Sequence, residues 1–233
     1  MWLGGGVTEL EWMTVGGVRL AVSVSGTPGA RPLVLLHGGG NDRSTWAGIA
    51  PAFAATHRVY APDLRGFGDS DRTAAYSFEA MRDDVQGMLD TVGAGPVDLV
   101  GHSLGGTVAW LVAQARPVAH LVVEDTPLPR PGSAPLPVPQ RPAGDLPYDW
   151  AAVEAVMRQL NEPDPVWWRD IPTVTAPTLL LAGGPSSHVD QGLLADAAAL
   201  LPDSRLVEIP VGHRIHATAP EAFVAQVRGF LAS

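Results

Sequence analysis

The chain has 233 residues, of which 46% are hydrophobic and 17% charged, and its formal net charge is −9. This length and composition predict a folded domain with a sizeable core, and the acidic balance argues against nucleic acid as a partner. There is no cysteine, which excludes disulfides, thiolate metal sites and a cysteine nucleophile.

Residues 1–6 (MWLGGG) have neither a basic segment nor a long apolar run, so they are not typical of a signal peptide. No apolar stretch elsewhere is long enough to span a bilayer. We therefore expect a cytoplasmic protein without a membrane span. The sequence carries no signal for its oligomeric state.

The predicted elements alternate between strand and helix. Residues 11–15 and 18–24 alternate around Gly16-Gly17 and predict a β-hairpin. Apolar runs and helical spacing then predict, in chain order, strand 32–36, helix 46–55, strand 58–61, helix 77–92, strand 97–100, helix 104–115 and strand 121–123.

The alternation stops at about residue 126. Residues 126–147 are dense in proline, which removes backbone donors and fixes φ, so no helix or central strand is expected there. Helices are expected at 149–160 and 165–169. The alternation then resumes with strand 178–181, helix 191–200, strand 205–208 and helix 220–231.

This order predicts an α/β fold with one mostly parallel sheet and helices on both faces. We expect a core domain made of residues 1–126 and 176–233. The insert at 127–175 is expected to form a small proline-rich and helical cap, because it is too short to hold a core of its own.

A serine lies at the junction of a predicted strand and helix, in Gly101-His102-Ser103-Leu104-Gly105. A residue there occupies a tight, strained turn, and the positions two before and two after it must be small. Gly101 and Gly105 meet that requirement. The turn is therefore a candidate nucleophile elbow with Ser103 as the nucleophile.

The serine needs donors for the oxyanion that develops in acyl transfer. His37-Gly38-Gly39-Gly40 follows a buried strand, and glycines there let the backbone approach a ligand. We predict that the amides of Gly39 and Leu104 form the oxyanion hole. His37, Gly38, His102 and, from the insert, Trp167 are the predicted lining of the substrate pocket.

The serine also needs a base, and His213 is the predicted one. It lies between the last predicted strand and the last helix, a junction at the same sheet edge as Ser103. His216 is expected to support that loop. His57 and His120 precede strands and are expected at the surface. His188 is either a loop hydrogen-bond residue or a lining residue of the acyl pocket.

Four motifs together resemble the α/β-hydrolase superfamily over nearly the whole chain: LLHGGG at 35–40, DLRGFGDS at 63–70, GHSLGG at 101–106 and GHRIH at 212–216. The resemblance implies the α/β-hydrolase fold, with Ser103 as nucleophile and His213 as base. The second motif resembles a structural loop of the family. Epoxide hydrolases and dehalogenases of this fold use a carboxylate where Ser103 stands, which argues against both activities.

The chain departs from the family at the acid. The loop that usually carries it here reads Gly183-Gly-Pro-Ser-Ser-His-Val-Asp190, with serines where the carboxylate is expected. A second arrangement resembles that of haloalkane dehalogenases, whose acid lies at the end of the strand that corresponds to residues 121–123 here. That comparison favours Asp125, while Glu124 and Asp190 remain alternatives.

These residues predict a serine hydrolase that cleaves an ester-like bond, a carboxylester, lactone or thioester, of a small to medium apolar molecule through an acyl-enzyme. No cofactor and no metal are expected. One alternative is a non-hydrolytic enzyme of the same fold, such as a lyase, cyclase or perhydrolase. Another is a binding protein that uses the pocket without catalysis.

Overall fold

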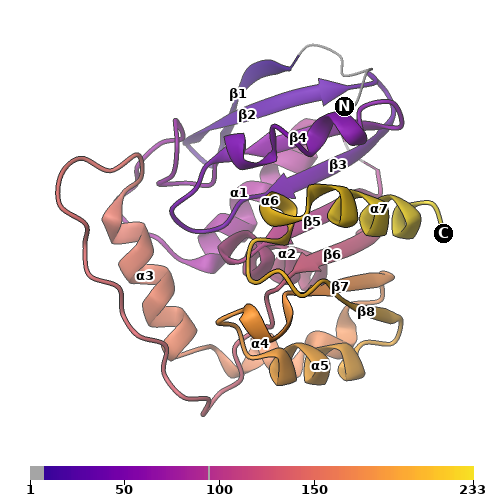
Figure 1. The fold of residues 1–233 in the computed structure, drawn as a ribbon. Helices are drawn as coiled ribbons and strands as arrows, with labels where there is room; N and C mark the ends of the chain where they lie inside the picture. Colours follow the sequence, from indigo (N-terminus) through magenta and orange to yellow (C-terminus); the bar gives the residue numbers. More distant parts are fainter. Residues whose placement is uncertain (1–7, 94) are drawn as a thin grey trace.

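The strands form a single eight-stranded sheet in the computed structural model, which describes residues 8–93 and 95–233 (Figure 1). They are β1 (Glu9–Val15), β2 (Val18–Gly26), β3 (Arg31–Leu36), β4 (His57–Pro62), β5 (Asp98–His102), β6 (His120–Glu124), β7 (Thr178–Ala182) and β8 (Ser204–Glu208). Their order across the sheet is β1-β2-β4-β3-β5-β6-β7-β8. β2 pairs antiparallel with β1 and β4, and all other neighbours pair parallel. The predicted mostly parallel sheet is confirmed.

Helices cover both faces of this sheet. They are α1 (Phe78–Thr91), α2 (Leu104–Ala115), α3 (Trp150–Asn161), α4 (Pro165–Arg169), α5 (Gln191–Leu200), α6 (Ile215–Thr218) and α7 (Pro220–Leu231). Figure 1 shows α7 in front of the sheet and α1 and α2 behind it. Side chains of a strand point alternately to the two faces. In β3, Val34 and Leu36 therefore join the core under α1 and α2, while Leu33 and Leu35 join the core under α7.

One predicted helix is wrong. Residues 46–55 do not form an α-helix, because the chain makes two short 3₁₀ turns there, Arg43–Trp46 and Ala50–Ala52. Pro51 lies inside the predicted span, and a proline in a helix interior removes a backbone donor and clashes with the preceding turn. The first turn is capped by Asp42, whose side chain accepts from the Ser44 amide at 2.8 Å.

The segment predicted to form a cap contains α3 and α4, and in Figure 1 α3 projects beyond the sheet. Two buried residues of α3, Ala152 and Val156, pack onto the core. The Gln159 side chain accepts from the Phe78 amide at 2.8 Å and donates to the Glu79 carboxylate at 2.7 Å. These contacts fasten the segment to the start of α1.

At the amino end of the parallel strands, His57 and His120 do not lie free on the surface as expected. Each donates to the fully buried carboxylate of Asp98, at 3.0 Å from His57 Nε2 and 2.7 Å from His120 Nδ1. A buried charge requires such partners. This cluster lies at the opposite edge of the sheet from Ser103, since β5 begins at Asp98 and ends just before the serine.

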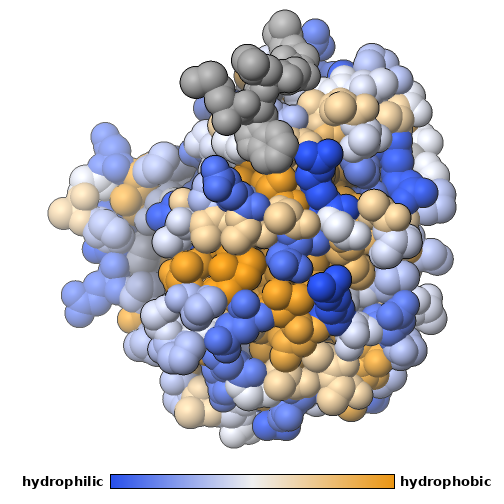
Figure 2. Space-filling model, turned by 45° about the vertical axis from the view of Figure 1, so that its right-hand side comes forward, coloured by the Kyte–Doolittle hydropathy of each residue, from blue (hydrophilic) through white to orange (hydrophobic). Residues whose placement is uncertain are grey.

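On the face shown in Figure 2, hydrophobic residues gather in patches near the centre, with hydrophilic residues around them. More than half of the accessible surface of a typical folded protein is apolar, so such patches are not by themselves unusual. Among the residues that the structure describes, no helix is both long and apolar enough to cross a membrane.

Candidate active site

Ser103 lies in a strained turn between β5 and α2. Its φ is 53° and its ψ −120°, a backbone conformation that L-residues rarely adopt. A Cβ on Gly101 would lie 2.3 Å from the Gly105 carbonyl oxygen, and one on Gly105 would lie 2.5 Å from that of Leu36. Only glycine fits at either position, as the sequence predicts. The turn leaves Ser103 partly exposed at the amino end of α2, where the helix dipole is positive.

The glycine loop after β3 lies directly against this turn. The Gly105 amide donates to the His37 carbonyl at 3.0 Å. A Cβ on Gly38 would lie 3.2 Å from Ser103 Cβ, and one on Gly39 3.6 Å from Leu104 Cδ1. The structure therefore brings the two predicted oxyanion-hole residues side by side. Within the described part of the chain, neither of their amides has a backbone or side-chain acceptor outside the helices and strands.

The His37 side chain stabilises this loop through two hydrogen bonds to the backbone. Its Nε2 accepts from the Leu64 amide at 3.0 Å, so the ring proton is on Nδ1, which donates to the Gly38 carbonyl at 2.9 Å. Burial lowers the pKa of His37 despite the nearby carboxylates of Asp63 and Asp42, which favours the neutral ring. The side chain is fully buried, so it shapes the loop and does not line an open pocket.

His213 follows β8 and points its Nδ1 at a carboxylate. The Nδ1 donates to Asp125 Oδ2 at 2.9 Å, because a carboxylate can only accept, so Nδ1 carries a proton, and within the described part of the chain Nε2 has no hydrogen-bond partner. Among the hydrogen bonds of the described residues, none joins the side chains of Ser103 and His213.

Asp125 follows β6 and also has a positive φ, 49°. Its Oδ1 accepts from the Gly183 amide at 2.8 Å and from Gln191 Nε2 at 3.0 Å, and its Oδ2 accepts from the Ser187 hydroxyl as well as from His213. Burial raises the pKa of Asp125, but these hydrogen bonds outweigh burial and hold the pKa at about 2. The carboxylate is therefore ionised at neutral pH.

Two of these donors, Ser187 and Gln191, come from the region where the family usually carries the acid. The sequence did not identify them as site residues. Only the parallel pairing of β6 with β7 brings the 183–191 segment against the end of β6, and that pairing is not visible in the residues themselves. This segment has serines where the family carries the acid, and it donates hydrogen bonds to an acid that follows the neighbouring strand β6.

The other two candidate acids have different partners. Glu124 is buried and accepts from the backbone amide and Nδ1 of His216, at 2.8 Å each. Asp190 caps α5, where it accepts from the Gly192 amide at 2.8 Å. Neither is hydrogen-bonded to His213 within the described residues, so Asp125 is the candidate acid that accepts from the predicted base.

His188 lies beside the predicted base, with its ring 4.4 Å from that of His213 in an edge-to-face arrangement. Partial burial and the neighbouring His213 lower the pKa of His188. Its position favours the second expectation for this residue, a place in the lining of the site.

The insert reaches the glycine loop through a residue that the sequence did not single out. A Cβ on Gly40 would lie 3.9 Å from the Tyr148 ring, and Tyr148 stacks on Phe67 at 5.8 Å. Trp167 is instead nearly fully buried, donates to Glu79 at 3.1 Å and packs edge-on against Phe78. Trp167 therefore packs the insert against the start of α1.

One group of side chains could hold a metal by residue type. His102, Glu124 and His216 have ligand atoms within 4.8 Å of one another, and all three are buried. However, both nitrogens of His216 already have partners, Glu124 and the Thr45 hydroxyl at 2.9 Å. A metal would have to break these bonds, so the donor set fits a hydrogen-bonded pair better than a metal centre.

A separate cavity of about 600 Å³ lies against β2, β4 and the turn at 43–46, and is lined in part by Ser23, Arg43 and Trp46. Ser103, Asp125 and His213 are not among its lining residues. It is therefore distinct from the candidate active site.

The comparisons with known proteins agree with this geometry. The family model described as the alpha/beta hydrolase fold matches residues 31–153. The mouse protein named sn-1-specific diacylglycerol lipase ABHD11 is 31% identical over 86% of this chain and 80% of its own length. Epoxide hydrolase A of Mycobacterium tuberculosis is 42% identical, but over 40% of this chain and 30% of that protein.

Solved structures share the fold over nearly the whole chain. A thermophilic esterase from Thermogutta terrifontis superposes with a TM-score of 0.80 at 24% identity, covering 96% of this chain and 98% of that one. An E-2-(acetamidomethylene)succinate hydrolase reaches 0.83 at 22% identity, over 97% and 100%. The family match and the likeness to relatives named as hydrolases support hydrolase activity. The chain belongs to the α/β-hydrolase superfamily.

Proposed function

We propose that this chain is a serine hydrolase that cleaves an ester-like bond, a carboxylester, lactone or thioester, of a small to medium apolar molecule through an acyl-enzyme. One observation carries the proposal: a strained, partly exposed Ser103 at a helix amino end shares the sheet edge with His213, whose Nδ1 donates to the carboxylate of Asp125. The mouse relative is named as a diacylglycerol lipase, which supports an ester as the substrate bond.

The proposed reaction begins with proton transfer. Nε2 of His213 takes the proton of Ser103 as the serine oxygen attacks the carbonyl carbon. The carbonyl oxygen becomes an oxyanion that accepts from the amides of Gly39 and Leu104, and one such donor contributes about 3–4 kcal/mol to the transition state. His213 then gives its proton to the leaving group.

Water repeats the sequence and releases the acid. Asp125 keeps its negative charge through the cycle, because its low pKa leaves no proton on it at neutral pH. The charge keeps the His213 proton on Nδ1 and stabilises the imidazolium that forms.

The apolar preference has support from the insert. The half-buried Tyr148 lies next to Gly40 in the predicted oxyanion loop, and the fully buried Phe67 stacks behind its ring. Pockets for small ligands are commonly lined by aromatic side chains with a few polar groups. The exposed part of the Tyr148 ring suits a small apolar acyl or alcohol group.

Hydrolysis of p-nitrophenyl acetate and p-nitrophenyl butyrate tests the proposal. We expect turnover by the native chain and its loss in Ser103→Ala, together with a mass increase on treatment with a fluorophosphonate in the native chain only. Full activity in Ser103→Ala would refute the assignment. Labelling without ester turnover would instead favour a non-hydrolytic enzyme of the same fold, and neither labelling nor turnover would favour a binding protein.

A further inference from the structure

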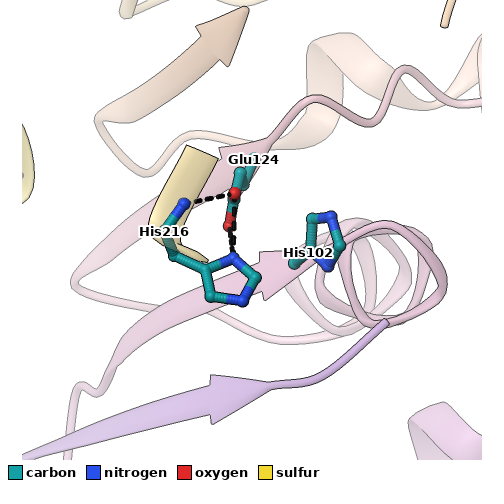
Figure 3. Close-up of side chains that lie close together, drawn as sticks. All are labelled: His102, Glu124 and His216. Carbon is teal, nitrogen blue, oxygen red and sulfur yellow. Dashed lines mark hydrogen bonds and ion pairs between the residues drawn. The ribbon is translucent and has the colours of Figure 1, made fainter. Parts of the chain in front are cut away.

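Two consecutive carboxylates at the end of β6 each accept from a histidine of the segment that follows β8. Asp125 accepts from His213, and Glu124 accepts from His216, three residues later. In the second pair, Glu124 Oε1 also accepts from the backbone amide of His216 at 2.8 Å (Figure 3). The proposed triad therefore has a second carboxylate–imidazole pair directly beside it.

The second pair is closed off from solvent. The side chains of Glu124 and His216 are at most 1% exposed. The remaining ring nitrogen of His216 is 2.9 Å from the Thr45 hydroxyl, and its ring lies 4.4 Å from that of Trp46. Such a satisfied network fixes the start of α6 against β6 and against the turn at 43–46. It contacts no open site, so it cannot act on substrate directly.

His102 connects this pair to the proposed base. Its Nε2 donates to the backbone carbonyl of His213 at 2.9 Å, and its ring lies 4.7 Å from that of His213 and 4.9 Å from that of His216. A carbonyl only accepts, so the His102 proton is on Nε2. Burial lowers the pKa of His102 to about 4, which keeps the ring neutral at neutral pH.

The other nitrogen of His102, Nδ1, is buried and has no partner among the described residues. It faces the glycine loop, because a Cβ on Gly38 would lie 2.7 Å from it. The ring is thus wedged between the proposed oxyanion loop and the loop of the proposed base. Since His102 directly precedes Ser103 in the chain, one side chain ties the nucleophile, the oxyanion loop and the base together.

We propose that His102 and the Glu124–His216 pair are positioning residues that set the distance between Ser103 and His213. This inference rests on the proposed function, in which those two residues exchange a proton. His102 holds the His213 main chain, and Glu124 holds the segment that follows it. A misplacement of about 1 Å between reacting groups is enough to lower a rate about a hundredfold.

The test compares two substitutions of His102. His102→Phe keeps a ring but removes the donor, and His102→Gln keeps a side-chain N–H donor near the Nε2 position. We expect His102→Phe to lower kcat on p-nitrophenyl butyrate about tenfold to a hundredfold, with KM within about twofold, because ground-state binding is not affected. His102→Gln should retain most of kcat, and Glu124→Gln should lower kcat without raising KM.

The matched control is His120→Phe, which removes a buried histidine donor at the opposite edge of the sheet. It should lower thermal stability and leave kcat per folded molecule unchanged. If His102→Phe behaves like this control, His102 has only a structural role and the inference is wrong.

A readout without substrate separates this inference from the proposed function. The Nδ1 proton of His213, observed by NMR, should shift or be lost to exchange in His102→Phe and persist in His102→Gln. An unchanged resonance in His102→Phe would overturn the positioning role whether or not the chain cleaves esters. Absence of turnover in the native chain, with the expected NMR change in His102→Phe, would overturn the proposed function and leave the positioning role standing.

Discussion

Replacing Asp125 with asparagine reverses the tautomer of the proposed base. The Gly183 amide donates to Oδ1 of Asp125, and so does Gln191 Nε2. The orientation of Gln191 is itself fixed, because its Oε1 accepts from the Gly184 amide at 3.1 Å. Two donors therefore require the amide oxygen of the introduced side chain at the former Oδ1 position, which leaves its NH₂ group where Oδ2 faced His213.

An NH₂ group donates, so His213 Nδ1 must accept and the ring proton moves to Nε2. The ring then has no lone pair to receive the serine proton. Loss of the correct tautomer in a serine triad lowers kcat about ten-thousandfold, which corresponds to about 5.5 kcal/mol of transition-state stabilisation. We expect a fall of this order in Asp125→Asn.

The assay is p-nitrophenyl butyrate turnover, with thermal unfolding measured on the same samples to show that the variant is folded. Asp190→Asn is the matched control, since Asp190 is the other aspartate considered as the acid and only caps α5. Asparagine also caps helices well, so this variant should keep native activity. Asp125→Asn with activity within tenfold of the native chain would refute the reasoning.

Three further predictions concern the support of the site. Ser187→Ala removes one hydrogen bond to Asp125 and should lower the unfolding free energy, measured with urea, by about 1.5–3 kcal/mol. Ser187→Thr keeps the hydroxyl and should lower it less, so equal decreases in the two variants would contradict this prediction. Gly101→Ala should lower the unfolding free energy by about 3 kcal/mol, because its Cβ would lie 2.3 Å from a backbone oxygen. Gly229→Ala is the control and should not lower it, since Gly229 is exposed in α7 with open space around it. An unchanged unfolding free energy in Gly101→Ala would count against the tight turn. Burial raises the pKa of Asp125 and hydrogen bonds lower it, which leaves it at about 2 against the usual 3.8, so the stabilisation by the ionised carboxylate should be complete above about pH 4 and lost as the pH falls through about 2. The difference in unfolding free energy between the native chain and Asp125→Asn should therefore be smaller at pH 2 than at pH 6. An equal difference at the two pH values would disprove the lowered pKa of Asp125.

Much of the fold was predictable because its elements are locally encoded. The spans 104–115, 165–169, 191–200 and 220–231 are those of α2, α4, α5 and α7. Ser77 caps α1 as expected and accepts from the Ala80 amide at 3.0 Å. The four-residue helix α6 was missed, since one turn carries too few residues to show a period.

The site was predictable where the backbone demands a residue type, and less so where the outcome depends on strand pairing. The glycines around Ser103 are required by contacts within a few residues and by one neighbouring loop. The choice between Glu124 and Asp125 depends on the pleat of β6 and on the positive φ of Asp125, neither of which a sequence displays. The partner of Glu124, His216, lies 92 residues away in the chain.

The separation in sequence of the site's components has a consequence for how activity returns during refolding. Asp125 and His213 are 88 residues apart, and Thr45 and His216 are 171 apart. Contacts between distant segments carry the largest loop-closure cost and are slow to form. The glycines that the turn at Ser103 requires, by contrast, have their tightest contacts within a few residues and with the loop at residues 36–37. Under the proposed mechanism, regain of ester turnover after dilution from urea therefore reports closure of the β6 to β8 half of the sheet, and it should lag behind the recovery of helical circular dichroism.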